Sequence, residues 1–315
     1  MSEALIIGCG VSGLSCGIRL LEAGYRARIW ARDLPPRTTS NVAAAIWYPY
    51  RAFPLERVGA WGAQTFAELT RLAAEPGTGV ISTSGIELFP DPVGDPWWLD
   101  SVTVFRRARP DELPEGYADG YVFEVPIVEM PTYLGYLMRR FQTLGGSIET
   151  RALASSDEAL AASDVVVNCS GLGARELVGD DSMFAVRGQV VRLSQVGLER
   201  FWLDDYGPRG LTYIVPRTND IILGGTDQEH DERLEPDPAT AVSIVERCAA
   251  LEPRLRDAQI LEHRVGLRPG RPSVRLEGER PAAGKLLVHN YGHGGAGVTL
   301  SWGCADEVAS IVRKA

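Results

Sequence analysis

The chain has 315 residues, of which 45% are hydrophobic and 23% are charged, and its formal net charge is −9. These values are typical of a globular protein long enough for two domains. No segment approaches the ~18–20 apolar residues of a membrane-spanning helix, and an acidic chain without a basic block is a poor nucleic-acid binder. We therefore expect neither a membrane nor a nucleic acid as partner. The five cysteines are scattered and form no CxxC, which argues against a disulfide framework.

The first 30 residues read as a strand, a turn, a helix and a second strand. Residues 4–7 are a short apolar run, residues 14–23 have helical periodicity, and residues 26–30 resume strand character. Between the first two elements lies Gly8-Cys9-Gly10-Val11-Ser12-Gly13, a GxGxxG. Glycines permit this tight turn and let backbone amides approach a pyrophosphate at the helix N-terminus. Because the motif follows a strand and opens a helix, we expect it to bind a dinucleotide.

The residues after the second strand leave the identity of that dinucleotide open. An acid is expected at this point to contact a ribose, and here Arg32 precedes Asp33. The arginine alone favours the 2′-phosphate of NADP, whereas the aspartate can still reach a ribose hydroxyl. An NAD(P)-dependent dehydrogenase therefore remains an alternative at this stage.

The rest of the chain alternates between helical and strand patterns. Helices are expected at residues 56–74, 131–144, 239–251 and 297–313. Strands are expected at residues 80–84, 86–89, 102–105, 121–128, 164–171, 211–216, 220–224 and 285–291. This order predicts an α/β fold, with a discontinuous doubly wound, Rossmann-like domain and a mostly antiparallel β domain inserted into it.

A second glycine-rich turn lies near the end of the chain. The string from Val288 to Ala305 runs from a strand through Gly292-His293-Gly294-Gly295-Ala296-Gly297 into the final helix. A second helix N-terminus is thereby directed at an anionic or electron-rich group.

This C-terminal string resembles the signature of the D-amino-acid oxidases, and the resemblance extends over essentially the whole chain. Other family motifs occur in order at residues 38–44, 168–171, 187–189, 213–216 and 266–269. The resemblance implies a D-amino-acid oxidase of the glutathione-reductase-like FAD oxidoreductases, with non-covalently bound FAD. It also implies an FAD-binding domain at 1–75, 132–185 and 280–315, and a substrate-binding domain at 76–131 and 186–279.

The resemblance assigns the cofactor site to the two glycine turns and the loops between them. The implied FAD-binding residues are Gly8, Gly10, Val11, Ser12, Gly13, Arg32, Asp33, Thr38, Thr39, Ser40, Ala44, Ala45, Ala152, Ser170, Gly294, Gly295, Ala296, Gly297, Val298 and Thr299. The final helix would then direct its dipole at the flavin edge where negative charge gathers on reduction.

Three residues are implied to bind the substrate. The guanidinium of Arg268 can hold a carboxylate by two parallel hydrogen bonds, the Tyr213 hydroxyl would donate to the same carboxylate, and the Gly295 carbonyl would accept from the amine. No residue is expected to act as acid or base, because the family transfers the α-hydrogen to flavin N5 as hydride. His289 and His293 are read as packing residues, and no cluster has metal-ligand spacing.

The sequence predicts the substrate side chain less directly. Gly224-Gly225-Thr226 precedes Asp227, where related D-aspartate oxidases carry a basic residue. We therefore expect neutral or apolar D-amino acids, oxidised with dioxygen to 2-oxo acids, ammonia and hydrogen peroxide. D-aspartate, glycine and sarcosine remain alternatives. Arg209 could approach the substrate, and the aromatic residues of Trp47-Tyr48-Pro49-Tyr50 could line its site or pack in the core.

The two ends of the chain carry expectations about its location. Met1-Ser2-Glu3 lacks the basic region of a signal peptide, and Arg313-Lys314-Ala315 is not a peroxisomal tripeptide. A cytoplasmic protein is expected, and a homodimer fits the resemblance.

Overall fold

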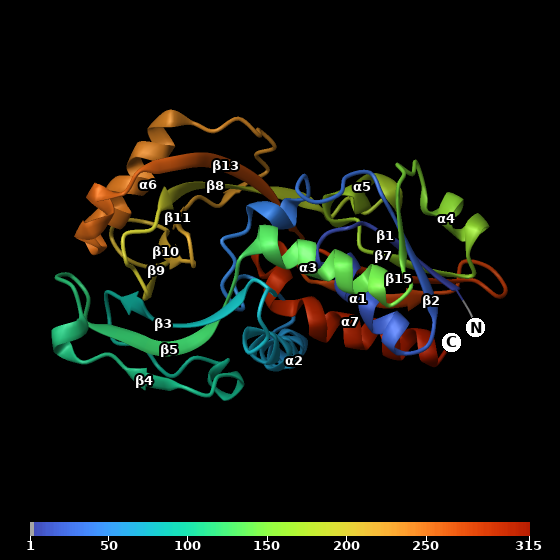
Figure 1. Ribbon diagram of the computed structural model, residues 1–315, viewed down its shortest axis with the longest axis horizontal. Helices are drawn as coiled ribbons and strands as arrows, with labels where there is room; N and C mark the ends of the chain where they lie inside the picture. Colours follow the sequence, from blue (N-terminus) through green and yellow to red (C-terminus); the bar gives the residue numbers. More distant parts are fainter. Residues whose placement is uncertain (1–2) are drawn as a thin grey trace.

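The computed structural model describes residues 3–315, which form two sheets side by side along the long axis (Figure 1). The first sheet has six strands in the order β14-β15-β7-β1-β2-β6. Its strands are β1 (Glu3–Ile7), β2 (Arg26–Ala31), β6 (Ser147–Thr150), β7 (Val165–Asn168), β14 (Arg275–Glu279) and β15 (Leu286–Tyr291). All neighbours pair in parallel except β14, which is antiparallel to β15.

Helices cover both faces of this parallel sheet, which explains its continuous apolar strands. On one face, alternate residues such as Ala4 and Ile6 of β1 join the main core; on the other, Leu5 and Ile7 pack with Leu160. The helices are α1 (Val11–Glu22), α2 (Leu55–Ala73), α3 (Met130–Thr143), α4 (Ser156–Ala162), α5 (Ala174–Leu177) and α7 (Gly297–Arg313). Figure 1 shows α1, α3 and α7 running together beside the sheet, and α4 lies on the second face.

The second sheet has nine strands and is antiparallel except where β3 meets β9. Its path is β12-β8-β11-β10-β9-β3-β5-β4, and β13 also pairs with β8. The strands are β3 (Val80–Phe89), β4 (Phe105–Arg107), β5 (Asp119–Val128), β8 (Phe184–Ser194), β9 (Phe201–Asp204), β10 (Thr212–Pro216), β11 (Asp220–Gly224), β12 (Gln228–Glu229) and β13 (Ile260–Gly270). Helix α6 (Pro238–Leu251) covers one face and contributes Ile244 and Cys248 to a separate core.

Short 3₁₀ helices connect these elements. They are η1 (Thr39–Val42), η2 (Leu99–Ser101), η3 (Pro110–Glu112), η4 (Gly171–Gly173), η5 (Pro253–Asp257) and η6 (Gly294–Ala296). Three of them, η1, η4 and η6, follow strands of the first sheet and lie against β13 of the second. These 3₁₀ helices, which follow strands of the first sheet, therefore lie where the first sheet meets the second.

The fold class and the four expected long helices are confirmed, with shifts of one residue at helix ends. Three strand predictions were wrong. The two strands expected at 80–84 and 86–89 are one strand, because Gly85 stays in the ladder opposite Phe123. The strand expected at 102–105 starts only at Phe105.

Two long strands of the second sheet, β8 and β13, were not predicted. Charged residues and glycines interrupt their apolar pattern. In β8, Arg187 is buried, and its guanidinium donates to the side chains of Gln189 and Gln228 and to the carbonyls of Arg233 and Glu235. Hydrogen bonds to all parts of the guanidinium make a buried charge tolerable in a strand.

No helix within residues 3–315 is long and apolar enough to cross a membrane. All five cysteines are buried free thiols.

Candidate functional site

Tyr213 and Arg268 lie on one face of the second sheet. Tyr213 of β10 is paired with Gly224 of β11. Gly224 is in turn paired with Val190 of β8, and Val190 with Arg264 of β13. Paired residues share a face, and Arg268 lies four residues beyond Arg264, so it returns to that face. One guanidinium nitrogen of Arg268, Nη1, donates to the carbonyl of Thr226 at 2.9 Å. This bond holds one side of the guanidinium, and the Tyr213 hydroxyl lies close enough to interact with the same group.

Glycines on neighbouring strands make room for both side chains. A Cβ at Gly224 would lie 1.9 Å from Cζ of Tyr213, and a Cβ at Gly188 would lie 2.6 Å from Cζ of Arg268. Such distances are shorter than any van der Waals contact, so the two side chains lie flat across the backbone of β11 and β8. Gly188 falls in the family motif at residues 187–189, and Gly224 in the Gly224-Gly225-Thr226 string; these distances explain why no larger residue fits at either position.

The second glycine turn meets these side chains from the first sheet. Gly295 lies in η6, between β15 and α7. A Cβ there would lie 2.8 Å from Cδ1 of Tyr50 and 3.7 Å from Cδ of Arg268. Hence the three predicted substrate residues, Tyr213, Arg268 and Gly295, come together from strand β10, strand β13 and the turn before the last helix.

The first glycine turn is packed as tightly as its motif requires. Gly8 has φ +106°, and a Cβ there would lie 2.4 Å from the Cys169 carbonyl oxygen; one at Gly13 would lie 2.0 Å from the Gly8 carbonyl oxygen. The Val11 amide at the start of α1 donates to Oγ of Ser40 at 3.1 Å. As a helix start has no intrahelical acceptors for its first amides, those of Ser12 and Gly13 are left for a phosphate.

Several predicted cofactor residues lie at the carboxyl edge of the first sheet, where nucleotides bind in open parallel sheets. Arg32 and Asp33 follow β2 and form an ion pair of 2.8 Å in which the arginine side chain is 79% exposed. Ala152 is exposed just after β6, the strand next to β2, and Ser170 follows β7 on the other side of β1. These four residues thus lie along one edge.

The loop from Thr38 to Ala45 closes over the start of α1. Thr38 donates to Oδ1 of Asn41 at 2.8 Å, and Thr39 and Ser40 lie in η1. Ala44 is half-buried, and the carbonyl of the buried Ala45 accepts from the Val128 amide, which ties the loop to β5.

These residues fit a dinucleotide. The first glycine turn leaves no room for a Cβ at Gly8 or Gly13, and Oγ of Ser170 is buried with no hydrogen-bond partner among residues 3–315. A buried hydroxyl without a partner is costly, so a ligand that bonds to it would relieve that cost. We expect FAD to occupy this edge.

The start of α7 has the geometry expected for a flavin contact. Gly292 and Gly294 have φ of +78° and +54°, and no side chain caps the helix at Ala296. The first helical residues, Gly297 and Val298, therefore have amides without side-chain partners. The Thr299 hydroxyl donates to the Tyr48 carbonyl at 2.9 Å and accepts from its amide at 3.1 Å, which positions the aromatic loop beside the turn.

Neither signature histidine is placed for proton transfer. His293 is buried, its Nε2 lies 3.0 Å from Oδ1 of Asn290, and burial lowers its pKa to about 4. His289 is 1% exposed, and burial also lowers its pKa. His293 packs in the turn, whereas His289 lies in β15 with its Nε2 3.2 Å from the Glu279 carboxylate.

Acidic residues surround Arg268 more densely than the sequence suggested. Asp227 forms an ion pair of 2.7 Å with Arg51, and its carboxylate lies 3.4 Å from the Tyr50 hydroxyl. The charge of Asp227 is therefore balanced by Arg51, a residue distant from it in the sequence. Two further acids near the site, Glu87 and Asp205, were not singled out, because neither belongs to a motif.

The aromatic residues and the arginine that the sequence placed near the substrate differ in where they lie. Trp47 is 1% exposed and donates to the Gly62 carbonyl in the core, so it does not line the site. Tyr48 and Tyr50 lie beside the site and bond to Glu87 and Asp227 respectively. Arg209 donates to the Tyr117 hydroxyl at 3.0 Å.

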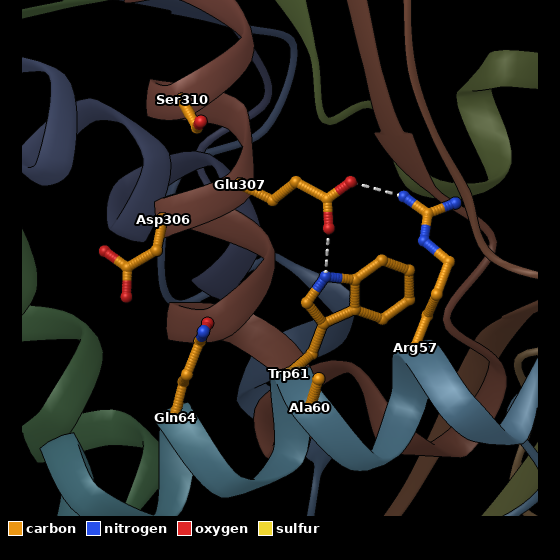
Figure 2. A pocket seen from close by; sticks show the side chains of 7 residues that line it. All are labelled: Arg57, Ala60, Trp61, Gln64, Asp306, Glu307 and Ser310. Atoms are coloured by element: carbon orange, nitrogen blue, oxygen red, sulfur yellow. Dashed lines mark hydrogen bonds and ion pairs between the residues drawn. The ribbon is translucent and has the colours of Figure 1, made fainter.

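A surface pocket of about 300 Å³ lies elsewhere, between α2 and α7 (Figure 2). There the Glu307 carboxylate accepts from both Arg57 and Trp61, at 2.5 and 2.6 Å. The pocket shares no residue with the predicted site. Its bonds join two packed helices, and we assign it a structural role.

Comparison with known proteins identifies the family of the chain. Residues 3–311 match the family described as "FAD dependent oxidoreductase". The chain is 56% identical over its whole length to a D-amino-acid oxidase of Rubrobacter xylanophilus, covering 97% of that protein. It is 39% identical to a human D-aspartate oxidase, with 98% of this chain and 94% of that protein covered.

Among solved structures, a glycine oxidase from Geobacillus kaustophilus has the same fold. Its TM-score is 0.81 at 19% identity, with 100% of this chain and 95% of that chain covered. The expected family, fold and FAD dependence are thus confirmed: the chain belongs to the FAD-dependent oxidoreductases that include the D-amino-acid oxidases.

Proposed function

We propose that the protein oxidises neutral and apolar D-amino acids to 2-oxo acids, ammonia and hydrogen peroxide. The observation that carries this proposal is the meeting of Arg268, Tyr213 and Gly295 at the turn that opens α7. An arginine held in place by a backbone carbonyl, beside a glycine turn that admits no Cβ, fits an α-amino carboxylate.

In this proposal Arg268 binds the substrate carboxylate in the two-bond geometry that a planar guanidinium favours. Burial raises the pKa of Tyr213, so its hydroxyl keeps its proton at neutral pH and can donate to the same carboxylate. The carbonyl of Gly295 accepts from the substrate amine. Together these contacts fix the carboxylate and the nitrogen, and thereby the direction of the Cα–H bond.

FAD bound at this site would supply the redox chemistry, namely an acceptor for the hydride from Cα and a carrier of the electrons to dioxygen. The residues proposed to hold it are those of the two glycine turns, the ends of strands β2, β6 and β7, and the loop after β2: Gly8, Gly10, Val11, Ser12, Gly13, Arg32, Asp33, Thr38, Thr39, Ser40, Ala44, Ala45, Ala152, Ser170, Gly294, Gly295, Ala296, Gly297, Val298 and Thr299. The uncapped start of α7 would stabilise negative charge there. No side chain needs to move a proton from Cα, and orientation supplies most of the catalysis.

D-aspartate is the main competing substrate, because the human relative is named a D-aspartate oxidase. A second substrate carboxylate would need a free cation beside Arg268. Arg51 is already paired with Asp227, and Asp205 nearby is an acid. These charges favour neutral over acidic side chains. An NAD(P)-dependent dehydrogenase has no support beyond the first turn and Arg32.

A substrate panel tests the proposal. The purified protein should be yellow and release peroxide with D-alanine and D-valine but not with the L-enantiomers. D-aspartate, glycine and sarcosine should be poor substrates. A colourless protein, or turnover without preference for D-enantiomers, would refute the proposal.

We also propose the two-domain division, with FAD bound by residues 1–75, 132–185 and 280–315 and substrate by 76–131 and 186–279. A cytoplasmic location and a homodimer belong to the same proposal. Fractionation of the host cell and sedimentation of the purified protein test these two points.

A further inference from the structure

Asp180 is a buried acid in the loop that leads from α5 to β8, and so from the first sheet to the second. Its carboxylate accepts four hydrogen bonds, from the amide and hydroxyl of Ser182 on Oδ1, and from the Tyr291 hydroxyl and Arg271 Nε on Oδ2. Burial alone would raise the pKa of Asp180, but these hydrogen bonds and the charge of Arg271 lower it to about 2. Asp180 is therefore a fixed anion whose two oxygens both have partners.

The two donors on Oδ2 belong to different sheets. Tyr291 is the last residue of β15 in the first sheet, and its hydroxyl lies 2.9 Å from Oδ2. Arg271 directly follows β13 of the second sheet, and its Nε lies 3.0 Å from the same oxygen. Arg275 of β14 donates to the Tyr291 hydroxyl at 2.8 Å, which leaves the hydroxyl proton for Asp180. One carboxylate oxygen thus joins the ends of β15 and β13.

The ends of these two strands carry the proposed site. Gly292, the residue after β15, has φ +78°, and a Cβ there would lie 2.8 Å from Cδ of Arg271, so the arginine side chain lies against the backbone of the turn. Arg268 is three residues before Arg271 in β13, and Gly295 is three residues after Gly292. Asp180 therefore holds the second glycine turn on one side and the strand of the proposed carboxylate-binding arginine on the other.

The directions of these hydrogen bonds determine how the turn and the strand meet. Desolvation offsets much of the attraction between buried charges, so a buried pair of this kind adds little net stability. Its hydrogen bonds nevertheless fix the positions of the groups that they join. Hydride transfer depends steeply on such positions, since a displacement of about 1 Å can lower a rate about 100-fold. A small shift of the second glycine turn against β13 would therefore slow the reaction in a protein that is still folded.

We propose that Asp180 is a positioning residue that acts through Tyr291 and Arg271, holding the second glycine turn against β13 and thereby setting the distance between the substrate Cα and the flavin. The inference rests on the proposed oxidase function and adds to it a residue outside the motifs. Asp180→Asn tests it with little change of shape. An asparagine side chain has one acceptor oxygen and one donor NH₂ group, whereas all the partners of Asp180 donate, so one pair of donors would face another donor.

Two measurements on the flavin-loaded protein separate positioning from stability. The first is the rate constant of flavin reduction by D-alanine in the absence of oxygen, measured over a range of D-alanine concentrations. In Asp180→Asn we expect this rate constant to fall about tenfold or more, while the half-saturating D-alanine concentration changes less than about threefold because Arg268 and Tyr213 remain. The second is the midpoint potential of the flavin. It should become more negative, because the start of α7 would no longer be held where it stabilises the charge of the reduced flavin.

Asp181→Asn is the matched control, since Asp181 is an exposed acid in the same loop, and it should keep wild-type values in both measurements. Tyr291→Phe removes only the hydroxyl and should shift both values in the same direction as Asp180→Asn. The double variant should reduce its flavin no more than about twofold more slowly than Asp180→Asn, because both changes break one contact.

A wild-type rate constant and potential in flavin-loaded Asp180→Asn would overturn the inference, even if its thermal stability were lower. If Asp180→Asn does not fold, Tyr291→Phe decides, and wild-type values in that variant would overturn the inference. If D-alanine does not reduce the wild-type flavin, the proposed function fails. The midpoint potential needs no substrate, so an unchanged potential in Asp180→Asn and Tyr291→Phe would then overturn the inference separately.

Discussion

Replacing Arg268 by alanine removes the cation that the account assigns to the substrate carboxylate. The guanidinium lies over Gly188, and Nη1 is held by the Thr226 carbonyl, so the free enzyme presents it in place. Truncating one partner of a hydrogen-bonded charge pair costs about 2–5 kcal/mol. At about 1.4 kcal/mol per factor of ten, kcat/KM should fall at least about 30-fold, mainly through a higher KM.

The assay is peroxide release over a range of D-alanine concentrations, together with flavin content from the visible spectrum. Arg268 lies in β13 and belongs to neither glycine turn, so Arg268→Ala should still bind FAD. Arg254→Ala is the control, because Arg254 pairs with Glu252 at the protein surface. Wild-type KM in a flavin-loaded Arg268→Ala variant would refute the assignment. Loss of flavin would show that the residue acts on the cofactor.

Three further predictions concern the glycines and Glu87. Gly13→Ala places a methyl group 2.0 Å from the Gly8 carbonyl oxygen, so the purified variant should contain little or no flavin; a full flavin content would contradict the cradle. Gly224→Ala should displace Tyr213 and raise KM about tenfold or more while flavin is retained; an unchanged KM would contradict the close approach. Burial raises the pKa of Glu87 from 4.5 to about 8 in the folded protein. Between pH 4.5 and pH 8 the Glu87 carboxyl therefore ionises in the unfolded chain but stays protonated in the folded one, so the free energy of unfolding falls as the pH rises. The stability advantage of Glu87→Gln, from urea unfolding of the flavin-loaded protein, should therefore grow from pH 5 to pH 8 by roughly 2–5 kcal/mol; a constant difference would contradict the raised pKa.

The parallel sheet was predictable because its strands are buried on both faces. Residues 4–7 and 164–171 show the apolar runs that such burial requires, and the glycines mark where the chain turns into helices. The antiparallel sheet was harder to predict. In β8 and β13, Arg187 and Arg268 occupy strand positions for hydrogen bonding and the proposed ligand contact. Their charges break the pattern that identifies a strand.

The site residues that belong to sequence motifs were predictable. Those that come near the site only through strand pairing were not. Glu87 belongs to no motif, and only the register of β3, β9 and β10 places it on the same face of the sheet as Tyr213. Likewise, Asp227 alone suggested an unbalanced acid, whereas its partner Arg51 lies far from it in the sequence. Charge balance in this site is a tertiary property.

We propose that this chain holds a D-amino acid with its Cα–H bond directed at the flavin. Mixing the yellow protein with D-alanine in the absence of oxygen tests it most directly. The flavin absorbance should bleach rapidly with D-alanine, remain with L-alanine, and return when air is admitted. An unchanged spectrum with D-alanine, or equal bleaching by both enantiomers, would contradict the account.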